Sequence, residues 1–191
     1  LDPRHQCFLH RGQRLQWRRH RHRCNRTRRQ HRLGARPENR HSRRFLHILF
    51  DTAFGRSGIA WDERGITRIQ LAEASAAATA SRLEEHGARR SRAAPPPHVA
   101  DAAQRVRRHL AGKPQDFASV PLSLDLLPAP RRRIYEAARA VPAGRTVTYS
   151  ELADRIGAPG AARAVGAAMA DNPFILAVPC HRVMGANGEL H

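Results

Sequence analysis

Residues 145–172 read RTVTYSELADRIGAPGAARAVGAAMADN and carry the clearest structural pattern of this 191-residue chain. The first part favours a brief extended segment followed by a short helix that ends at Gly157, because a glycine just past the last turn commonly ends a helix. Thr148 or Ser150 is expected to cap that helix, and Glu151 stands three residues after Thr148, as in a capping box. The turn APG and a second short helix follow. This order predicts a helix-turn-helix.

The second helix, over residues 161–172, is unusually thin. It is built mostly from alanine and glycine, and Arg163 is the one long polar side chain near its beginning. Small side chains allow close approach either to a neighbouring helix or to the wall of a DNA groove. Packing inside the domain explains most of the alanines, but it does not explain the position of Arg163.

Upstream of this region the periodicity changes between strand and helix. Residues 131–144 predict an amphipathic helix with Ile134, Ala138 and Val141 on one face. Residues 45–70 contain short apolar runs broken by glycines, which predicts two or three hairpin-linked strands. Further elements are expected in the order helix at 72–86, helix at 99–112 closed by Gly112, and strand at 120–127. Strands and helices mixed within about eighty residues indicate a small α+β unit.

The first 44 residues differ in composition from the rest. They carry 15 Arg against Asp2 and Glu38, a net charge of +13 out of the chain's formal +18, and show no periodicity. Such a segment cannot bury enough apolar area to fold, so we expect it to be disordered. Two interpretations stay open for residues 1–44: a basic arm that gathers onto nucleic acid phosphates, or a wrongly assigned gene start.

Cysteine usage and hydropathy exclude several classes of protein. The three cysteines, Cys7, Cys24 and Cys180, form no close pair, which argues against a disulfide framework and fits a reducing compartment. The spacing of Cys7 and Cys24 matches no compact zinc pattern, so no metal site is predicted there. No apolar run approaches the roughly 20 residues that a membrane-spanning helix needs. We therefore expect a cytoplasmic protein without a membrane partner.

The chemistry-bearing motif is NPFILAVPCHRV, residues 172–183. A thiol is nucleophilic as the thiolate, and nearby cations or an imidazole base favour that form. His181 and Arg182 directly follow Cys180, although adjacent side chains need not face each other. On these residues alone, a reactive cysteine and a buried structural cysteine beside a surface His and Arg are equally supported.

The blocks TVTYSELA, RAVGAAMADNPF and PCHRV, taken together and in this order, resemble the O6-alkylguanine-DNA alkyltransferases, the methylated-DNA–protein-cysteine S-methyltransferases. The resemblance covers about residues 45–191 and is strongest from Ile134 onward. It implies direct DNA repair without a cofactor or metal, in which Cys180 irreversibly takes the alkyl group from O6-alkylguanine, and also from O4-alkylthymine. The implied partner is double-stranded DNA containing alkylated guanine, bound by a monomer.

The same resemblance implies roles for individual residues. His181 would draw the thiol proton through a water molecule, and Tyr149 would crowd the phosphate 3′ of the lesion. Arg163 would fill the gap left by the flipped nucleotide. Asn172 would hold the turn that carries the cysteine. Contacts with the DNA or the base are further expected from Arg182 and from Val183, whose backbone carbonyl, like that of Cys180, would meet the guanine edge.

The expected architecture is α+β, with a basic segment at 1–44, a small ribonuclease-H-like domain at 45–128, and a winged-helix-like catalytic DNA-binding domain at 129–191. Relatives continue for about twenty residues past the cysteine motif, with a glycine-rich loop and a helix whose Glu orients the histidine, so this chain is expected to be truncated. The alternative is a non-catalytic protein that binds alkylated DNA, inactive for lack of that tail. A transcription-factor domain is a third interpretation, but it gives PCHRV no role and the thin helix lacks the side chains that read base edges.

Overall fold

The computed structural model describes residues 43–186, which belong to one compact unit. The expectations for the basic segment over residues 1–42, and for Cys7 and Cys24 within it, lie outside the described residues.

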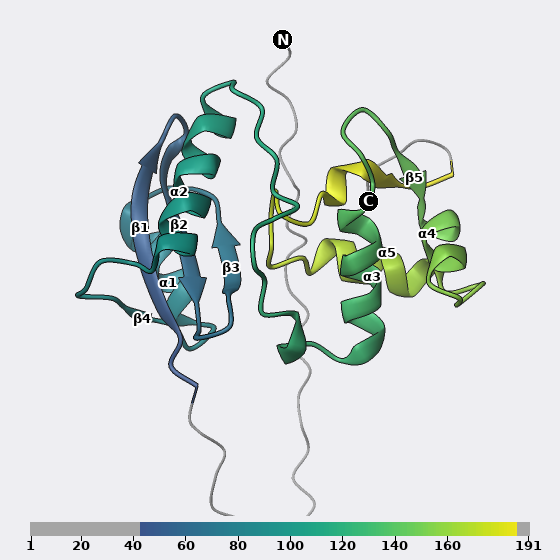
Figure 1. Ribbon diagram of the computed structural model, residues 1–191, viewed down its shortest axis with the longest axis horizontal. Coiled ribbons are helices and arrows are strands. Elements are labelled where there is room, and N and C mark those ends of the chain that lie inside the picture. Colours follow the sequence, from purple (N-terminus) through teal and green to yellow (C-terminus); the bar gives the residue numbers. More distant parts are fainter. Residues whose placement is uncertain (1–42, 187–191) are drawn as a thin grey trace, which may run out of the picture. The chain divides into compact units, whose positions relative to one another are not determined.

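A four-stranded sheet forms the first half of this unit (Figure 1). The strands follow the order β3-β2-β1-β4, with β1 antiparallel to β2, β2 antiparallel to β3, and β4 parallel to β1. Two or three hairpin-linked strands were predicted for residues 45–70, and the structure has three there. The strand bounds are β1 (Leu46–Thr52), β2 (Gly55–Trp61), β3 (Ile66–Gln70) and β4 (Arg89–Arg90).

Two helices cover opposite faces of this sheet. Adjacent residues of a strand point to opposite faces. Ile59 shares a core with Val99 and Val106 of α2 (Pro97–Leu110), whereas Ala60 packs with Leu83 of α1 (Ala76–Glu84). Both helices were predicted, and Gly112, with φ +78°, follows the end of α2 as expected.

The strand predicted over residues 120–127 is wrong. Only Leu122 pairs with the sheet, through a single parallel bridge to Ile66, and the chain then enters the 3-10 turn η1 (Leu124–Leu126). The hydroxyl of Ser123 donates to the buried carboxylate of Asp62 at 2.5 Å. This side-chain contact takes the place of a further ladder of backbone hydrogen bonds. Apolar and polar residues do alternate over residues 120–127, but the contact of Ser123 with Asp62 accompanies a 3-10 turn instead of a strand.

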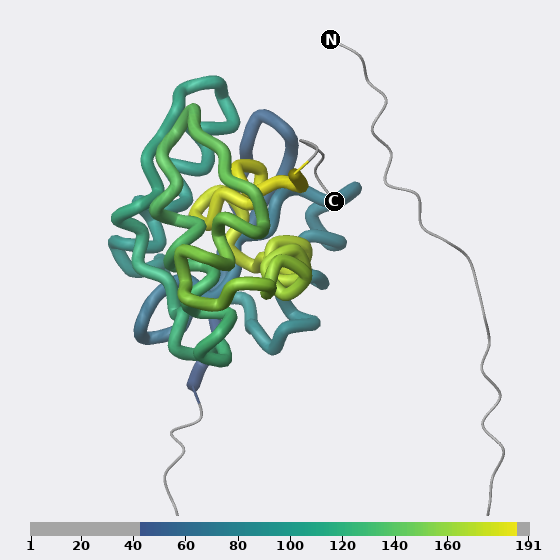
Figure 2. Tube along the Cα trace, turned by 90° about the vertical axis from the view of Figure 1, so that its right-hand side faces the viewer, coloured from purple at the N-terminus to yellow at the C-terminus, as the bar shows by residue number. Residues whose placement is uncertain are grey.

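The second half is mainly helical. Its three helices are the predicted ones: α3 (Ala129–Arg139), α4 (Tyr149–Arg155) and α5 (Ala162–Ala170). Two short strands, β5 (Val147–Thr148) and β6 (Val183–Met184), pair in parallel, and the 3-10 turn η2 (Cys180–Arg182) directly precedes β6. Figure 2 shows α5 nearly end-on, followed by the yellow segment that carries the cysteine.

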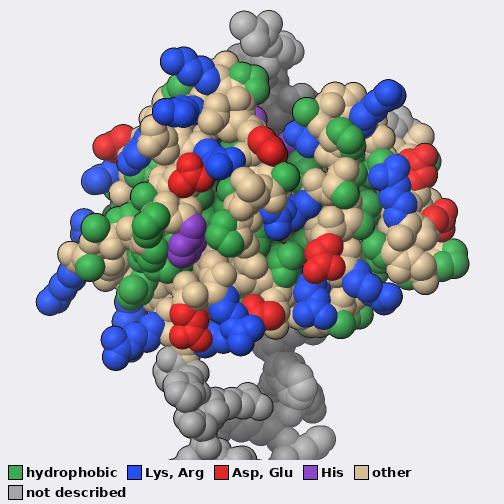
Figure 3. Space-filling model, in the orientation of Figure 1, with side chains coloured by type: hydrophobic (Ala, Val, Ile, Leu, Met, Phe, Trp, Pro, Cys, Tyr) green, Lys and Arg blue, Asp and Glu red, His purple; other side chains and the backbone are tan. Residues whose placement is uncertain are grey.

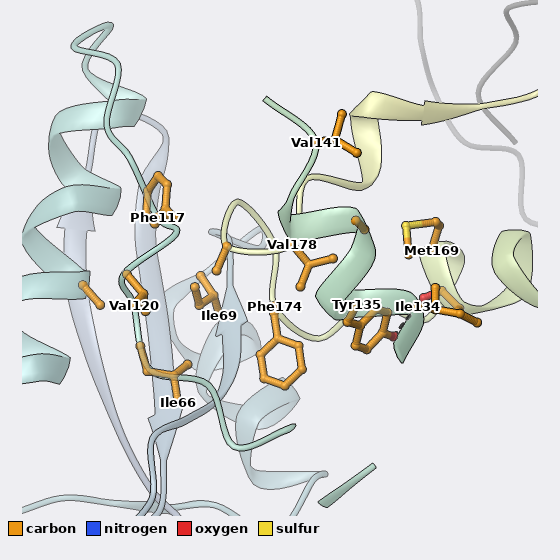
Figure 4. Close-up of a cluster of buried hydrophobic side chains, with 14 of the residues drawn as sticks. Ile66, Ile69, Phe117, Val120, Ile134, Tyr135, Val141, Met169, Phe174 and Val178 are labelled. Carbon is orange, nitrogen blue, oxygen red and sulfur yellow. Dashed lines mark hydrogen bonds between the residues drawn. The ribbon is translucent and has the colours of Figure 1, made fainter. Parts of the chain in front are cut away.

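One hydrophobic core joins the two halves. Its buried residues include Ile66 and Ile69 of the sheet, Val106 of α2, and Ile134 and Tyr135 of α3. Phe174 lies between the sheet residues and Tyr135, and its ring meets that of Tyr135 edge to face at a centroid distance of 5.9 Å (Figure 4). The predicted inner face of α3 is confirmed, because Ile134, Ala138 and Val141 are all buried.

The α+β fold class predicted from the sequence is confirmed by this mixture of a four-stranded sheet, a two-stranded sheet and five α-helices among the described residues. Within residues 43–186, no helix is long and apolar enough to cross a membrane. The face shown in Figure 3 intersperses Lys and Arg side chains with Asp and Glu side chains.

Candidate active site

Cys180 begins the 3-10 turn η2, directly after Pro179. Its backbone N–H donates to the carbonyl of Val178 at 2.9 Å, and the N–H of Arg182 donates to the carbonyl of Pro179 at 2.9 Å. The cysteine is partly buried and is a free thiol. The backbone around the sulfur is therefore fixed while the side chain keeps access to solvent.

Asn172 fixes the segment that leads to the cysteine. Its Nδ2 donates to the carbonyl of Val178 at 2.8 Å, and its Oδ1 accepts from the N–H of Phe174 at 2.9 Å. The residue is only 8% exposed. An amide carries both a donor and an acceptor, so a single side chain closes this loop at both ends.

Contacts with the sheet hold the same segment from the other side. The N–H of Ile69 in β3 donates to the carbonyl of Pro173 at 2.8 Å, and Phe174 is buried in the core. Between these anchors Leu176 adopts φ +72°, a left-handed conformation that costs a non-glycine residue free energy. Leu176 thus lies within a loop that hydrogen bonds hold at residues 172 and 178.

The pairing of β5 with β6 brings Tyr149 close to the cysteine turn in the fold. Val147 pairs with Val183 and Thr148 with Met184, so the residue after β5 lies beside the strand that follows η2. Val183 is fully buried, as a member of the core.

Helix α4 begins with the predicted capping box. Thr148 is the N-cap: its hydroxyl accepts from the N–H of Glu151 at 3.1 Å, and the Glu151 carboxylate accepts from the N–H of Thr148 at 2.6 Å. Hydrogen bonding to the Thr148 backbone holds the pKa of Glu151 below its usual value. Of the two capping candidates, the structure selects Thr148 rather than Ser150. The cap fixes the orientation of Tyr149, the first residue of the helix.

The thin helix α5 presents an exposed stripe of small side chains. Arg163, Ala167 and Ala170 are exposed, whereas Val165 is buried in the core. A methyl group built on Gly166 would lie 4.0 Å from the ring of Tyr149, so the ring packs close to the α5 backbone. Within the described part of the chain, Arg163 makes no hydrogen bond or ion pair, and its guanidinium extends into solvent.

The pKa of His181 lies below the ordinary 6.5. Partial desolvation of the ring lowers it first, followed by the positive charges of Arg182 and His109. The residue as a whole is exposed, so solvent reaches it. A lowered pKa favours the neutral imidazole, which can accept a proton.

Arg182 contributes to the architecture of the turn. Its guanidinium donates to the carbonyl of Val141 at 2.8 Å and so ties η2 to the end of α3. A cleft lies beside this contact, lined by Val141, His181 and Arg182 on one side and by His109 and Phe117 on the other. His109 was not singled out in the sequence, because a lone histidine in an amphipathic helix gives no signal of its position near His181.

Comparisons with known proteins agree with this arrangement. Residues 129–191 match the family model of the 6-O-methylguanine DNA methyltransferase DNA-binding domain. A methylated-DNA–protein-cysteine methyltransferase of Shigella flexneri is 32% identical over 145 residues, 76% of this chain and 78% of that protein. The chain belongs to the methylated-DNA–protein-cysteine methyltransferase family. The resemblance inferred from the sequence is thereby confirmed, and with it the class of enzyme, a DNA-binding repair methyltransferase.

Two further relatives of the methyltransferase show how far the likeness extends. That of Mycolicibacterium paratuberculosis is 44% identical over 96 residues, so this match covers 50% of the chain and 56% of the relative. The crystal structure of Mycobacterium tuberculosis OGT in complex with DNA is 32% identical, with a TM-score of 0.60 over 76% of this chain and 81% of that one. The likeness thus includes both halves of the described fold.

Several predicted site residues of the methyltransferase lie on connected elements. Asn172 and Cys180 delimit one loop, and His181 and Arg182 continue the turn. Tyr149 reaches the same region through the β5–β6 pair. Arg163 lies on the exposed face of α5, and Val183 is buried in β6.

Proposed function

We propose that this protein repairs DNA by transferring the alkyl group of O6-alkylguanine irreversibly to Cys180. The observation that carries the proposal is the cysteine turn itself: a free, partly exposed thiol on a loop fixed by buried Asn172, followed directly in the sequence by His181, whose pKa is lowered. Membership of the family supports the assignment, as does the DNA complex of the M. tuberculosis relative.

The proposed reaction is a single displacement at carbon. The Cys180 thiol loses its proton, and the thiolate sulfur attacks the methyl carbon of O6-methylguanine. The S–C bond forms while the C–O bond breaks, and the bonding electron pair leaves on the guanine oxygen. The guanine takes up one proton, so the products are S-methylcysteine and an unmodified guanine. No oxidant or reductant is needed, and we propose no metal or organic cofactor.

The proposed base is His181, acting through a water molecule. Its lowered pKa supports this role, because a histidine that is neutral at pH 7 can accept the thiol proton. After transfer, the imidazolium and the water provide a source for the proton that the guanine leaving group requires.

Access to O6 requires the damaged nucleotide to leave the base stack, at a cost of a few kcal/mol. We propose that α5 approaches the duplex along its stripe of small residues and that Arg163 fills the gap. The exposed and unpaired guanidinium of Arg163 and the small exposed side chains beside it support this step. Tyr149, packed against Gly166, would contact the phosphate 3′ of the lesion and the extruded base.

Further contacts are proposed from the residues around the turn. The backbone carbonyls of Cys180 and Val183 would meet the guanine edge, and Arg182 would contribute to DNA and base binding while tied to Val141. O4-alkylthymine is proposed as a second substrate. We also propose that the protein acts as a cytoplasmic monomer.

We propose a ribonuclease-H-like domain at 45–128 and a winged-helix-like domain at 129–191. The first is supported by the strand order β3-β2-β1-β4, with three antiparallel strands followed by a helix and a strand parallel to β1. The second is supported by the helix-turn-helix of α4 and α5 together with the β5–β6 pair.

The decisive experiment is mass spectrometry of the intact chain and its peptides after incubation with a duplex containing O6-methylguanine. We expect the gain of one methyl group, mapped to Cys180 and absent from Cys180→Ala. Cys7 and Cys24 serve as internal controls, because a non-specific methylating agent would also mark them. The lesion-binding alternative predicts no gain of mass but tighter binding to the damaged duplex than to an undamaged one. Absence of both effects in a folded protein would overturn the proposed function.

A further inference from the structure

A cationic cleft lies where the exposed stripe of α5 ends. It is lined on one side by residues of β3, of α1 and of the segments after them, including Arg68 and Arg82, and on the other by Arg131, Ala170 and Asp171. Ala170 is the last exposed alanine of the stripe that begins at Arg163. The cleft therefore continues the proposed DNA-facing surface onto the first half of the protein.

The acidic side chains of the cleft are already paired with two of its three arginines. Asp171 accepts from Arg131 at 3.1 Å, and Glu73 lies 3.9 Å from the Nε of Arg82. Arg82 has a second partner, Glu85, at 3.3 Å. These pairs leave the charge of Arg68 without a counter-ion within the cleft.

Arg68 is half-buried, and within residues 43–186 its side chain makes no hydrogen bond or ion pair. Burial, and next the charge of Arg82, lower its pKa, although an arginine still stays protonated. The pKa of His86, which also lines this cleft, is lowered by desolvation and then by the charges of Arg68 and Arg82. A histidine has no negative form near pH 7, so it supplies no counter-ion to Arg68. A partly desolvated guanidinium without an ion-pair partner is a binding site that an anion would complete.

We propose that this cleft binds a backbone phosphate of the DNA strand that runs along α5, with Arg68 as its principal ligand. The inference rests on the proposed function, since it takes α5 as the DNA-facing helix. From Arg163 to Ala170 the helix rises by about 10 Å, at about 1.5 Å per residue. At about 3.4 Å per base pair, the phosphate lies about three base pairs from the flipped nucleotide. The first half of the protein thereby becomes part of the DNA-binding surface.

The test measures affinity of the full chain for an undamaged duplex as a function of salt concentration. One lost phosphate contact reduces the slope of log K against log salt by about 0.9. We expect this reduction for Arg68→Gln. Between 1 M and 0.1 M salt, the ratio of the wild-type affinity to the Arg68→Gln affinity should therefore rise about eightfold. Arg68→Lys keeps the charge and should retain the slope. The control is Arg108→Gln. Arg108 is an exposed residue of α2, which covers the opposite face of the sheet, so its loss removes the same charge and should leave the slope unchanged.

A second measurement locates the contact. A duplex containing O6-methylguanine is prepared with one phosphate at a time replaced by an uncharged methylphosphonate. Both chains compared carry Cys180→Ala, so that no methyl transfer consumes the lesion. We expect one replacement, about three base pairs from the lesion, to weaken binding of Cys180→Ala but not of the double variant that adds Arg68→Gln.

The outcomes separate this inference from the proposed function. Equal salt slopes for Arg68→Gln, Arg108→Gln and the wild type, with all three folded by circular dichroism, overturn the phosphate site even if Cys180 becomes methylated. A reduced slope for Arg68→Gln alone supports the site even if no methyl transfer to Cys180 is seen. A wild-type chain that binds no duplex overturns both.

Discussion

Replacement of Asn172 should destabilise the protein through one loop, and the structure allows the cost to be worked out. Asn172→Ala leaves the Phe174 N–H without its partner in a site that is 8% exposed, and it removes one of two donors to the Val178 carbonyl, which keeps the N–H of Cys180. Leaving one buried polar group unsatisfied costs about 1–3 kcal/mol, and losing a hydrogen bond costs about 1 kcal/mol. We therefore expect a total loss of about 2–4 kcal/mol. For a protein of this size the melting temperature should fall by roughly 6–12 °C.

Asn172→Asp separates the two hydrogen bonds. The carboxylate can still accept from the Phe174 N–H, but it cannot donate to Val178 and instead faces that carbonyl with negative charge. We expect it to be as destabilising as Asn172→Ala at pH 7. The matched control is Gln115→Ala, which removes exposed amide contacts to Lys113 and Pro114 and should change stability by no more than about 0.5 kcal/mol.

Thermal unfolding followed by circular dichroism measures these differences, and the rate of Cys180 methylation is measured well below the melting temperature. We expect a slower rate for both Asn172 variants, because the loop that carries the thiol loses its fixed end. If Asn172→Ala melts within about 1 °C of Gln115→Ala, the hydrogen-bond reasoning is refuted.

Three further predictions concern single groups. The rate of methyl transfer should be constant near neutral pH and fall with a midpoint below pH 6.5, because the lowered pKa keeps His181 neutral until then; a midpoint above 6.5 in a stopped-flow pH profile contradicts this. Glu151→Gln keeps an acceptor for the capping box but loses the charge, so urea unfolding should show a smaller loss of stability than for Thr148→Ala, which should cost about 1 kcal/mol. Tyr135→Phe leaves the carbonyl of Ala168 without its buried donor and should cost about 1–3 kcal/mol in the same assay.

Local signals account for what the sequence predicts well. The capping box at Thr148, the glycine after α4 and the apolar face of α3 depend on neighbours within a few positions, and all are found in the structure. These structural features can be predicted because each one depends on interactions between residues close together in the sequence. The enzyme class was predicted differently, from the resemblance of three sequence blocks to a known family.

Contacts between distant residues explain what could not be predicted. The 120–127 strand fails because Ser123 bonds to Asp62, which lies 61 positions earlier. The left-handed conformation of Leu176 follows from anchors that include Ile69, and the proximity of His109 to His181 depends on how α2 packs. No periodicity or motif records these pairings, since each depends on the completed core.

The first half of the protein therefore does more than support the second. Strand β3 binds the loop before the cysteine through Ile69, and the guanidinium of Arg139 in α3 donates to three carbonyls of the connecting segment, those of Phe117, Ala118 and Val120. Because one core is shared, a perturbation of the sheet must reach the loop that holds Cys180. The position of Cys180 is thus a property of both halves, and a fragment lacking β3 would lose the anchor at Pro173 even if α4 and α5 still formed.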